Sequence, residues 1–150
     1  MSVTLSKESF ECMGLFQAVT SVTAKDCVIE DGRVVFIVET ANMGTAIGAG
    51  GKNIYTLQKR LSRRVKVFEF DQEPEKFLAN LLDGIKPQKI KILTDKEQQK
   101  TAVVQISPED KGKLIGAEGK NIKTLTTLLQ RHHGLNSIKI KTGSVSITTK

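Results

Sequence analysis

The sequence contains few aromatic side chains and few of the residues that catalysis and metal binding use. Its 150 residues include no tryptophan, one tyrosine, six phenylalanines and two histidines. Base stacking on aromatic platforms needs more such residues, so that mode of nucleic-acid binding is not expected. No histidine, serine or cysteine falls in a recognisable catalytic arrangement, and the neighbouring His132 and His133 make a poor metal pair. We therefore expect no enzyme activity, no metal site and no cofactor.

Cysteines and long hydrophobic runs are also scarce. Cys12 and Cys27 are isolated and lack a Cys-x-x-Cys spacing, so we expect two buried, reduced thiols. No run of about 18 apolar residues is present, which excludes a transmembrane helix. Residues 1–7 lack the basic and then apolar build of a signal peptide. These absences predict a cytoplasmic protein with no membrane partner.

One short run of residues occurs twice. The run Ile47-Gly48-Ala49-Gly50-Gly51-Lys52-Asn53-Ile54 returns 68 residues later as Ile115-Gly116-Ala117-Glu118-Gly119-Lys120-Asn121-Ile122. The same register pairs Leu57 with Leu125 further along the chain. A repeat of this kind indicates two structural units, which we place at residues 1–71 and 72–150.

Both units show the same order of predicted elements: helix, strand, strand, helix, glycine turn, helix, strand. In the first unit, apolar periodicity predicts helices over 6–19, 41–47 and 52–62, and strands over 27–30, 33–39 and 64–70. Asp31-Gly32 is a hairpin signal, and Ser6 can cap the first helix. In the second unit the helices are expected over 73–84, from Ser107 to the turn, and over 121–133, with strands over 89–94, 101–106 and 137–141. Residues 144–150 are either a further strand or a tail. The prediction is an α+β fold in which three helices cover one face of each three-stranded sheet.

The glycine turns have a composition that suits a phosphate group. Glycine permits a sharp turn and a close approach by another backbone. A helix that begins at the second glycine presents amide groups and a partial positive charge, and Lys52 or Lys120 adds a full charge. The isoleucines that flank each turn (Ile47, Ile54, Ile115 and Ile122) would anchor it in the core and line an apolar groove. Plain helix connectors remain the alternative. A P-loop is excluded, because it needs glycine at positions 46 and 114 and Ser or Thr at 53 and 121.

The pattern Ile-Gly-x-x-Gly-Lys-x-Ile between two helices resembles the signature of KH domains, whose loop clamps single-stranded nucleic acid. The whole chain resembles the short archaeal NusA-like transcription factors, which consist of two KH modules and little else. The resemblance implies two tandem type II (prokaryotic) KH domains, single-stranded RNA as the ligand, a role in transcription termination or antitermination, and RNA polymerase as a candidate second partner. Rival roles are ribosome assembly, RNA processing, or a protein-binding scaffold on the polymerase. The residues carried over as RNA-binding are Ile47, Gly48, Ala49, Gly50, Gly51, Lys52 and Asn53, and Ile115, Gly116, Ala117, Glu118, Gly119, Lys120, Asn121 and Lys123.

The two copies differ in charge. Residues 1–71 hold nine Lys and Arg against eight Asp and Glu, a net of +1, whereas residues 72–150 hold fourteen against eight, a net of +6. The excess positive charge favours a polyanionic partner. However, the second loop places Glu118 where a phosphate would lie. We expect the first loop to grip RNA closely and the basic second module to attract and extend the contact. The cluster Arg60, Arg63 and Arg64 either contacts RNA or is a solvated, charged helix end, and both interpretations stay open. Tyr55 is a further candidate for contact with a base.

Overall fold

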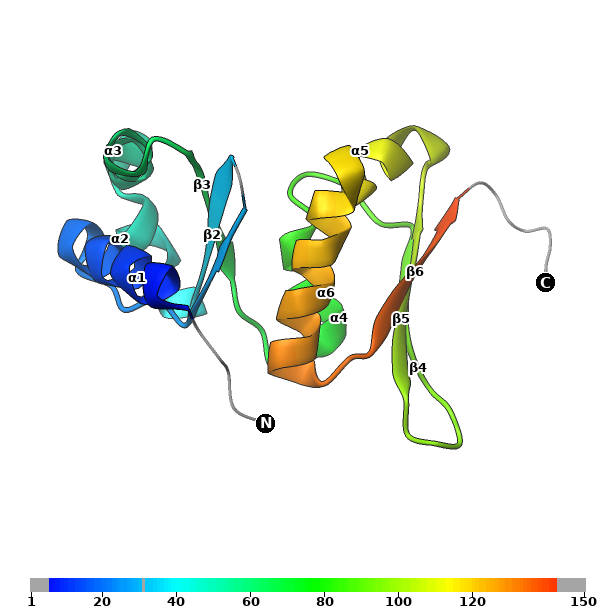
Figure 1. Ribbon diagram of the computed structural model, residues 1–150. Coiled ribbons are helices and arrows are strands. Elements are labelled where there is room, and N and C mark those ends of the chain that lie inside the picture. Colours follow the sequence, from blue (N-terminus) through cyan, green and yellow to red (C-terminus); the bar gives the residue numbers. More distant parts are fainter. Residues whose placement is uncertain (1–5, 31, 143–150) are drawn as a thin grey trace. The chain divides into compact units, whose positions relative to one another are not determined.

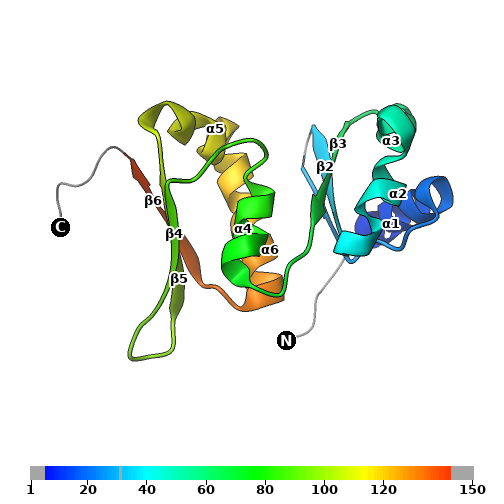
Figure 2. The same ribbon diagram turned by 180° about the vertical axis from the view of Figure 1, so that it is seen from behind.

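The computed structural model describes residues 6–30 and 32–142 of the chain (Figures 1 and 2). The chain divides into two compact units, and the division falls between Asp71 and Gln72. Each unit contains one three-stranded sheet. The predicted order of helices and strands and the α+β fold class are confirmed in both units.

The first unit is built on a central strand, β2 (Arg33–Val38). It pairs antiparallel with β1 (Asp26–Ile29) and parallel with β3 (Arg64–Glu69). Asp31 of the predicted hairpin turn lies outside the described residues, and the Glu30 N–H donates to the Arg33 carbonyl at 2.7 Å beside it. The helices are α1 (Lys7–Thr20), α2 (Met43–Ile47), which follows the short 3-10 helix η1 (Thr40–Asn42), and α3 (Lys52–Leu61).

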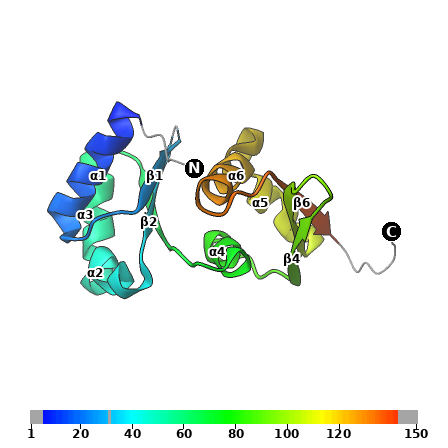
Figure 3. The same cartoon turned by 90° about the horizontal axis from the view of Figure 1, so that it is seen from below.

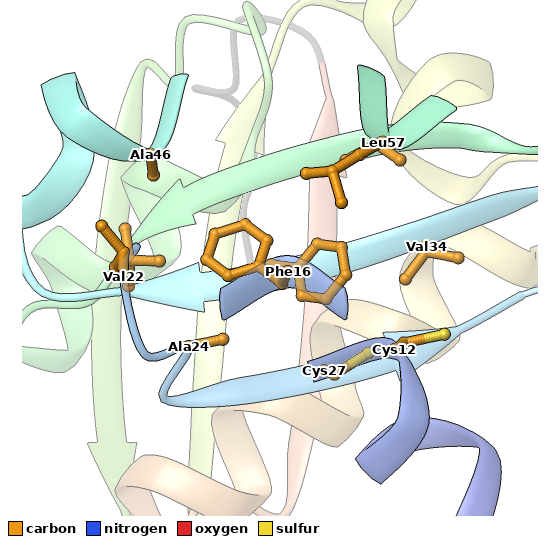
Figure 4. Close-up of a cluster of buried hydrophobic side chains, with 11 residues drawn as sticks. Cys12, Phe16, Val22, Ala24, Cys27, Val34, Ala46 and Leu57 are labelled. Atoms are coloured by element: carbon orange, nitrogen blue, oxygen red, sulfur yellow. The ribbon is translucent and has the colours of Figure 1, made fainter. Parts of the chain in front are cut away.

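The core of the first unit joins α1 to the sheet. Ser6 caps α1 as predicted, because its hydroxyl oxygen accepts the Ser9 N–H at 3.0 Å. The Phe16 ring of α1 then stacks on Phe36 of β2 with 4.4 Å between ring centroids. Cys12 and Cys27 lie in the same cluster (Figure 4). Both thiols are buried, which confirms the prediction of their burial. All six residues of β2 are buried, which explains its continuous apolar run.

The second unit repeats this topology. β5 (Lys100–Ile106) lies between β4 (Lys89–Thr94), its antiparallel neighbour, and β6 (Ser137–Thr142), its parallel neighbour. Three helices, α4 (Pro74–Leu81), α5 (Lys111–Ile115) and α6 (Lys120–His133), lie on one face of this sheet (Figures 1 and 3). Their fully buried leucines close over the inward side chains of β5, Ala102, Val104 and Ile106.

Two sequence-based details of the second unit were inaccurate. α4 ends at Leu81 rather than at Gly84, because the backbone already turns left-handed at Asp83, with φ of 51°. Ser107 begins no α-helix and makes no side-chain cap, and a 3-10 helix, η3 (Pro108–Asp110), precedes α5. His132 and His133 lie in the last turn of α6, with their rings 5.7 and 5.5 Å from the ring of Phe77. Residues 144–150, expected as a strand or tail, lie outside the described residues.

Two kinds of feature are absent from the part of the chain that the structure describes. Within residues 6–30 and 32–142, no helix is long and apolar enough to cross a membrane. The same residues contain no group of three or more His, Cys, Asp or Glu side chains placed to hold a metal ion.

Candidate nucleic-acid interface

The first glycine loop joins α2 to α3 through the 3-10 helix η2 (Ala49–Gly51). Gly48, Gly50 and Gly51 all have positive φ, at 79°, 62° and 78°, a region that L side chains rarely adopt. A Cβ atom added at Gly48 would lie 3.0 Å from Asn53 Nδ2 and 3.2 Å from the Asn53 backbone nitrogen. The turn therefore requires glycine at position 48 for two reasons, backbone conformation and space.

The second loop has the same backbone but one different residue type. Gly116 and Gly119 have φ of 80° and 74°, and η4 (Ala117–Gly119) joins α5 to α6. A Cβ atom at Gly116 would lie 2.8 Å from the backbone nitrogen of Asn121, which is closer than at Gly48. Glu118 occupies the position of Gly50 and has φ of 56°. A non-glycine residue pays about 1–2 kcal/mol for this left-handed conformation, so the carboxylate sits at a strained position.

An asparagine ties each loop to the helix before it. Asn53 Nδ2 donates to the carbonyl of Thr45 at 3.0 Å, and Asn121 Nδ2 donates to the carbonyl of Leu114 at 2.8 Å. The sequence analysis placed both asparagines among the RNA contacts and did not predict these hydrogen bonds. The recurrence of Asn directly after the Lys in both copies is the signal that could have indicated them. The two side chains hold the helices on either side of the turn, and an RNA contact by either one stays a prediction.

The two loops differ in the charged groups that surround their lysines. No side chain caps the N-terminus of α3 or α6, so both helix ends have unbonded amide groups and a partial positive charge. Lys52 is exposed and forms no ion pair with any described residue. Lys120 lies 3.9 Å from the carboxylate of Glu118. The second loop thus carries a carboxylate that offsets part of its own lysine's charge, whereas the first loop does not.

The apolar residues that flank the loops are buried to different degrees. Ala46 and Leu114, just before the loops, are buried, whereas Ile47 and Ile115 are only half-buried. Ile54, the isoleucine that follows the first loop, packs against the core of its unit, as expected of an anchor. The half-buried isoleucines remain accessible at the side of each turn, where the sequence analysis expected a groove.

Other candidates lie on α3 or just after it. Tyr55 is 61% exposed and carries the Lys59 ammonium 5.2 Å from its ring centroid. Arg63 Nη1 lies 3.2 Å from the Glu8 carboxylate, which favours a structural role for this member of the arginine cluster. Arg60 and Arg63 line an open hollow of about 350 Å³ with Glu8 and Cys12 among its other lining residues. Burial, followed by the negative charge of Glu8, raises the pKa of the Cys12 thiol.

Comparison with known proteins defines the class of the chain. A family model described as "KH domain" matches residues 13–72, and one described as "NusA-like second KH domain" matches residues 74–143. The chain is therefore a tandem KH-domain protein, and each glycine loop is the Gly-x-x-Gly loop of one domain.

The relatives define the family more closely. The chain is 37% identical over 141 residues to the "Probable transcription termination protein NusA" of Halobacterium salinarum, covering 93% of this chain and 99% of the relative. It is 30% identical to the protein of the same name from Methanocaldococcus jannaschii, covering 92% of this chain and 75% of the relative. The crystal structure of APE1850 superposes with a TM-score of 0.73 at 30% identity, covering 91% of this chain and 100% of that one. The chain belongs to the NusA-like family of archaeal tandem KH proteins.

Proposed function

We propose that the chain binds single-stranded RNA through its two Gly-x-x-Gly loops and acts as a NusA-like factor in transcription termination or antitermination. The observation that carries the proposal is the form of the loops. Each leaves no room for a side chain at its first glycine, and each ends at an uncapped helix N-terminus beside a lysine. Such a turn admits a sugar-phosphate backbone closely and offers it amide groups and positive charge. The names of the relatives, which describe transcription termination proteins, support the role.

The proposed contact residues are those that the sequence carried over. In the first loop they run from Ile47 to Asn53, and in the second from Ile115 to Asn121, with Lys123 on the exposed side of α6. Each set is consecutive around one turn, apart from Lys123, which follows on α6. We propose that the first loop binds more tightly, because Lys52 is free of ion pairs among the described residues and Gly50 has no side chain where the second loop has Glu118.

The proposal is for a binding protein rather than an enzyme. A phosphate clamp holds its ligand without changing it, and we recognise no catalytic arrangement of side chains in the sequence of either loop. RNA polymerase is the proposed second partner, because a termination factor acts on RNA as it leaves the polymerase. Transcription in archaea takes place in the cytoplasm, so this function would locate the chain there. Residues 1–71 and 72–150 are proposed as the two domains.

The test is titration of labelled single-stranded RNA, followed by fluorescence anisotropy. The variant Ala49→Asp/Gly50→Asp puts two carboxylates in the first loop and should lower the affinity about tenfold or more. Its matched control, Gln17→Glu/Thr23→Asp, changes the net charge equally at two exposed positions outside the loops. Loss of affinity in the loop variant alone supports the proposal. Equal affinities for wild type and both variants, with all three folded, would show that the loops are structural turns, and the protein-scaffold role would then take precedence.

A further inference from the structure

The open face of the second sheet carries a set of lysines that the RNA-binding loops do not use. α4, α5 and α6 all lie on the other face of this sheet (Figures 1 and 3). Side chains alternate between the faces of a strand. The inward face is given by Ala102 and Val104, which are fully buried, so Thr101, Val103 and Gln105 of β5 point to the open face.

The strand register gathers the lysines on that open face. Lys91 of β4 and Lys139 of β6 stand on either side of Val103, and Lys89 and Lys141 stand on either side of Gln105. A hydrogen bond of 3.1 Å between the hydroxyls of Thr101 and Ser137, which occupy the next row, confirms that these rows share one face. Because β5 lies between β4 and β6, lysines in one row are two strand spacings, about 9.6 Å, apart, and alternate residues of one strand are about 6.7 Å apart. The four lysines therefore form a regular two-by-two array of positive charge.

Nothing described neutralises this array. All four lysines are exposed, and none forms an ion pair with a described residue. The three strands β4, β5 and β6 contain five lysines, counting Lys100, and no aspartate or glutamate. Like charges at these distances repel one another, so the array favours an anionic partner that spans several lysines at once.

The array is absent from the first domain, although the fold is the same. The register of the first sheet places Val28 and Lys66 on either side of Val35, and Asp26 and Phe68 on either side of Ile37. The corresponding face therefore has one lysine where the second sheet has four. The feature belongs to the second domain and is not a requirement of the fold.

We propose that the open face of the second sheet, Lys89, Lys91, Lys139 and Lys141, is a second nucleic-acid contact surface that holds the phosphate backbone of RNA without reading its bases. The inference rests on the proposed function, because RNA held at the loops of the same chain reaches this face at a high effective concentration. RNA fits the face better than an acidic protein does, because lysine ammonium groups act as point charges for phosphates and regular spacing suits a regular polyanion. The face offers no aromatic side chain on which a base would stack, so contact with phosphates is the mode that remains.

The experiment compares two RNA lengths. A KH loop holds about four nucleotides, so unstructured mixed-sequence RNA of roughly 8 nucleotides has no more chain than two loops hold, and RNA of roughly 30 nucleotides leaves enough chain for a further surface. The test variant is Lys89→Gln/Lys91→Gln/Lys139→Gln/Lys141→Gln. Its control, Lys7→Gln/Lys76→Gln/Lys86→Gln/Lys96→Gln, removes the same charge from four exposed lysines off this face. Lys91→Gln/Lys139→Gln alone serves if the fourfold variant does not fold.

The proposal expects the test variant to lose about tenfold or more in affinity for the long RNA and little for the short RNA. The slope of log affinity against log salt is negative, and each lost phosphate contact should make it less steep by about 0.7. Equal losses in the test and control variants would mean that net charge alone matters, and equal losses for both RNA lengths would mean that there is no separate surface; either result overturns the proposal. If the test variant binds the long RNA as the wild type does but no longer binds poly-glutamate, the face is a site for an acidic protein. That result also overturns the proposal.

The same titrations separate this proposal from the function on which it rests. The loop variant Ala49→Asp/Gly50→Asp should weaken both RNAs. If the loop variant binds both RNAs like the wild type while the sheet variant weakens the long one, the loop function fails and the sheet surface stands. The reverse pattern, a weak loop variant and a sheet variant like the wild type, leaves the loop function and overturns the sheet surface.

Discussion

The two loops have nearly the same backbone, yet the middle of the turn is Gly50 in one and Glu118 in the other, with φ of 62° and 56°. Both turns close with an N–H to carbonyl bond of 3.1 Å between their end glycines. The glutamate is accommodated in the geometry that glycine prefers, and its carboxylate remains 84% exposed beside Lys120. The backbone of the turn therefore stays nearly the same when glutamate replaces glycine at its middle, although the charge of the loop changes. The geometry of the turn and its preference for a ligand can thus vary separately.

The more positively charged domain has the loop that carries a negative side chain. The second domain has a net charge of +6 against +1 for the first, but its loop holds the carboxylate. Its excess lysines include the four on the open face of the sheet. We infer a division in which the first domain grips the RNA backbone in its loop and the second attracts the RNA over a wider surface.

The largest expected effect is on stability, at the first glycine of each loop. Gly116→Ala should lower the free energy of unfolding by about 3 kcal/mol, because it combines a positive φ with a contact near 2.8 Å to backbone. Gly48→Ala should cost about 2 kcal/mol, since its closest neighbour is the end of the Asn53 side chain. Urea unfolding followed by circular dichroism measures both.

The matched controls for these variants are the helix glycines at the same repeat offset. Gly44→Ala and Gly112→Ala meet nothing within 4 Å, and alanine favours the helix, so each should raise stability by up to about 1 kcal/mol. Destabilisation by all four substitutions to the same degree would contradict the requirement for glycine at the loop position.

The next effect is on affinity, through an exchange of the two middle residues. Gly50→Glu should weaken RNA binding about fivefold to tenfold, and Glu118→Gly should strengthen it by a smaller factor, because a carboxylate near a phosphate is repelled but also screened by salt. Gly50→Gln and Glu118→Gln are the controls, since they keep the shape and remove the charge. If the glutamine and glutamate variants of one loop bind alike, charge is not the cause of the difference.

A smaller effect separates conformation from charge at the same position. Glu118→Gly should stabilise the second domain by about 0.5–1 kcal/mol, since glycine adopts φ near 56° without strain but loses more entropy on folding. Gly50→Ala should cost about 1 kcal/mol in the first domain for the reverse reason. Thermal unfolding of each variant gives the two values, and a destabilised Glu118→Gly variant would mean that the Glu118–Lys120 contact outweighs the strain.

The smallest effect concerns the thiols, which only the first domain contains. Burial raises the pKa of Cys12, so the folded state holds the thiol proton more tightly than the unfolded state. Stability from this group is full below the unfolded pKa and is lost as the pH rises through the folded pKa. Alkylation by iodoacetamide at pH 8 should therefore be slow in the folded protein and fast in urea. Rapid labelling of the folded chain would show that the first domain opens readily.

Much of the fold followed from local patterns in the sequence. The repeat of Gly-x-x-Gly-Lys predicted both turns, and apolar periodicity together with helix-start signals predicted the helices around them. Ser6 was recognised as a cap because the bond to Ser9 is local. Ser107 has the same residue type before a helix but makes no such bond, since the backbone there forms a 3-10 turn that no short pattern distinguishes from an α-helix.

The features that escaped prediction depend on distances set by the folded chain. The bonds of Asn53 to Thr45 and of Asn121 to Leu114 cross the turn, so they appear only once two helices are placed side by side. The lysine array likewise needs the strand order and register, because Lys91 and Lys139 are neighbours across β5 and distant in sequence.

The most direct test of the unequal loops is an NMR titration of the ¹⁵N-labelled chain with single-stranded RNA. The backbone amides of Ala49–Gly51 and Ala117–Gly119 report the two turns separately in one sample. We expect the amide chemical shifts of the first loop to change and to saturate at a lower RNA concentration than those of the second. If the second loop saturates first, or if the shifts of neither loop change while RNA binds, the first loop is not the principal clamp.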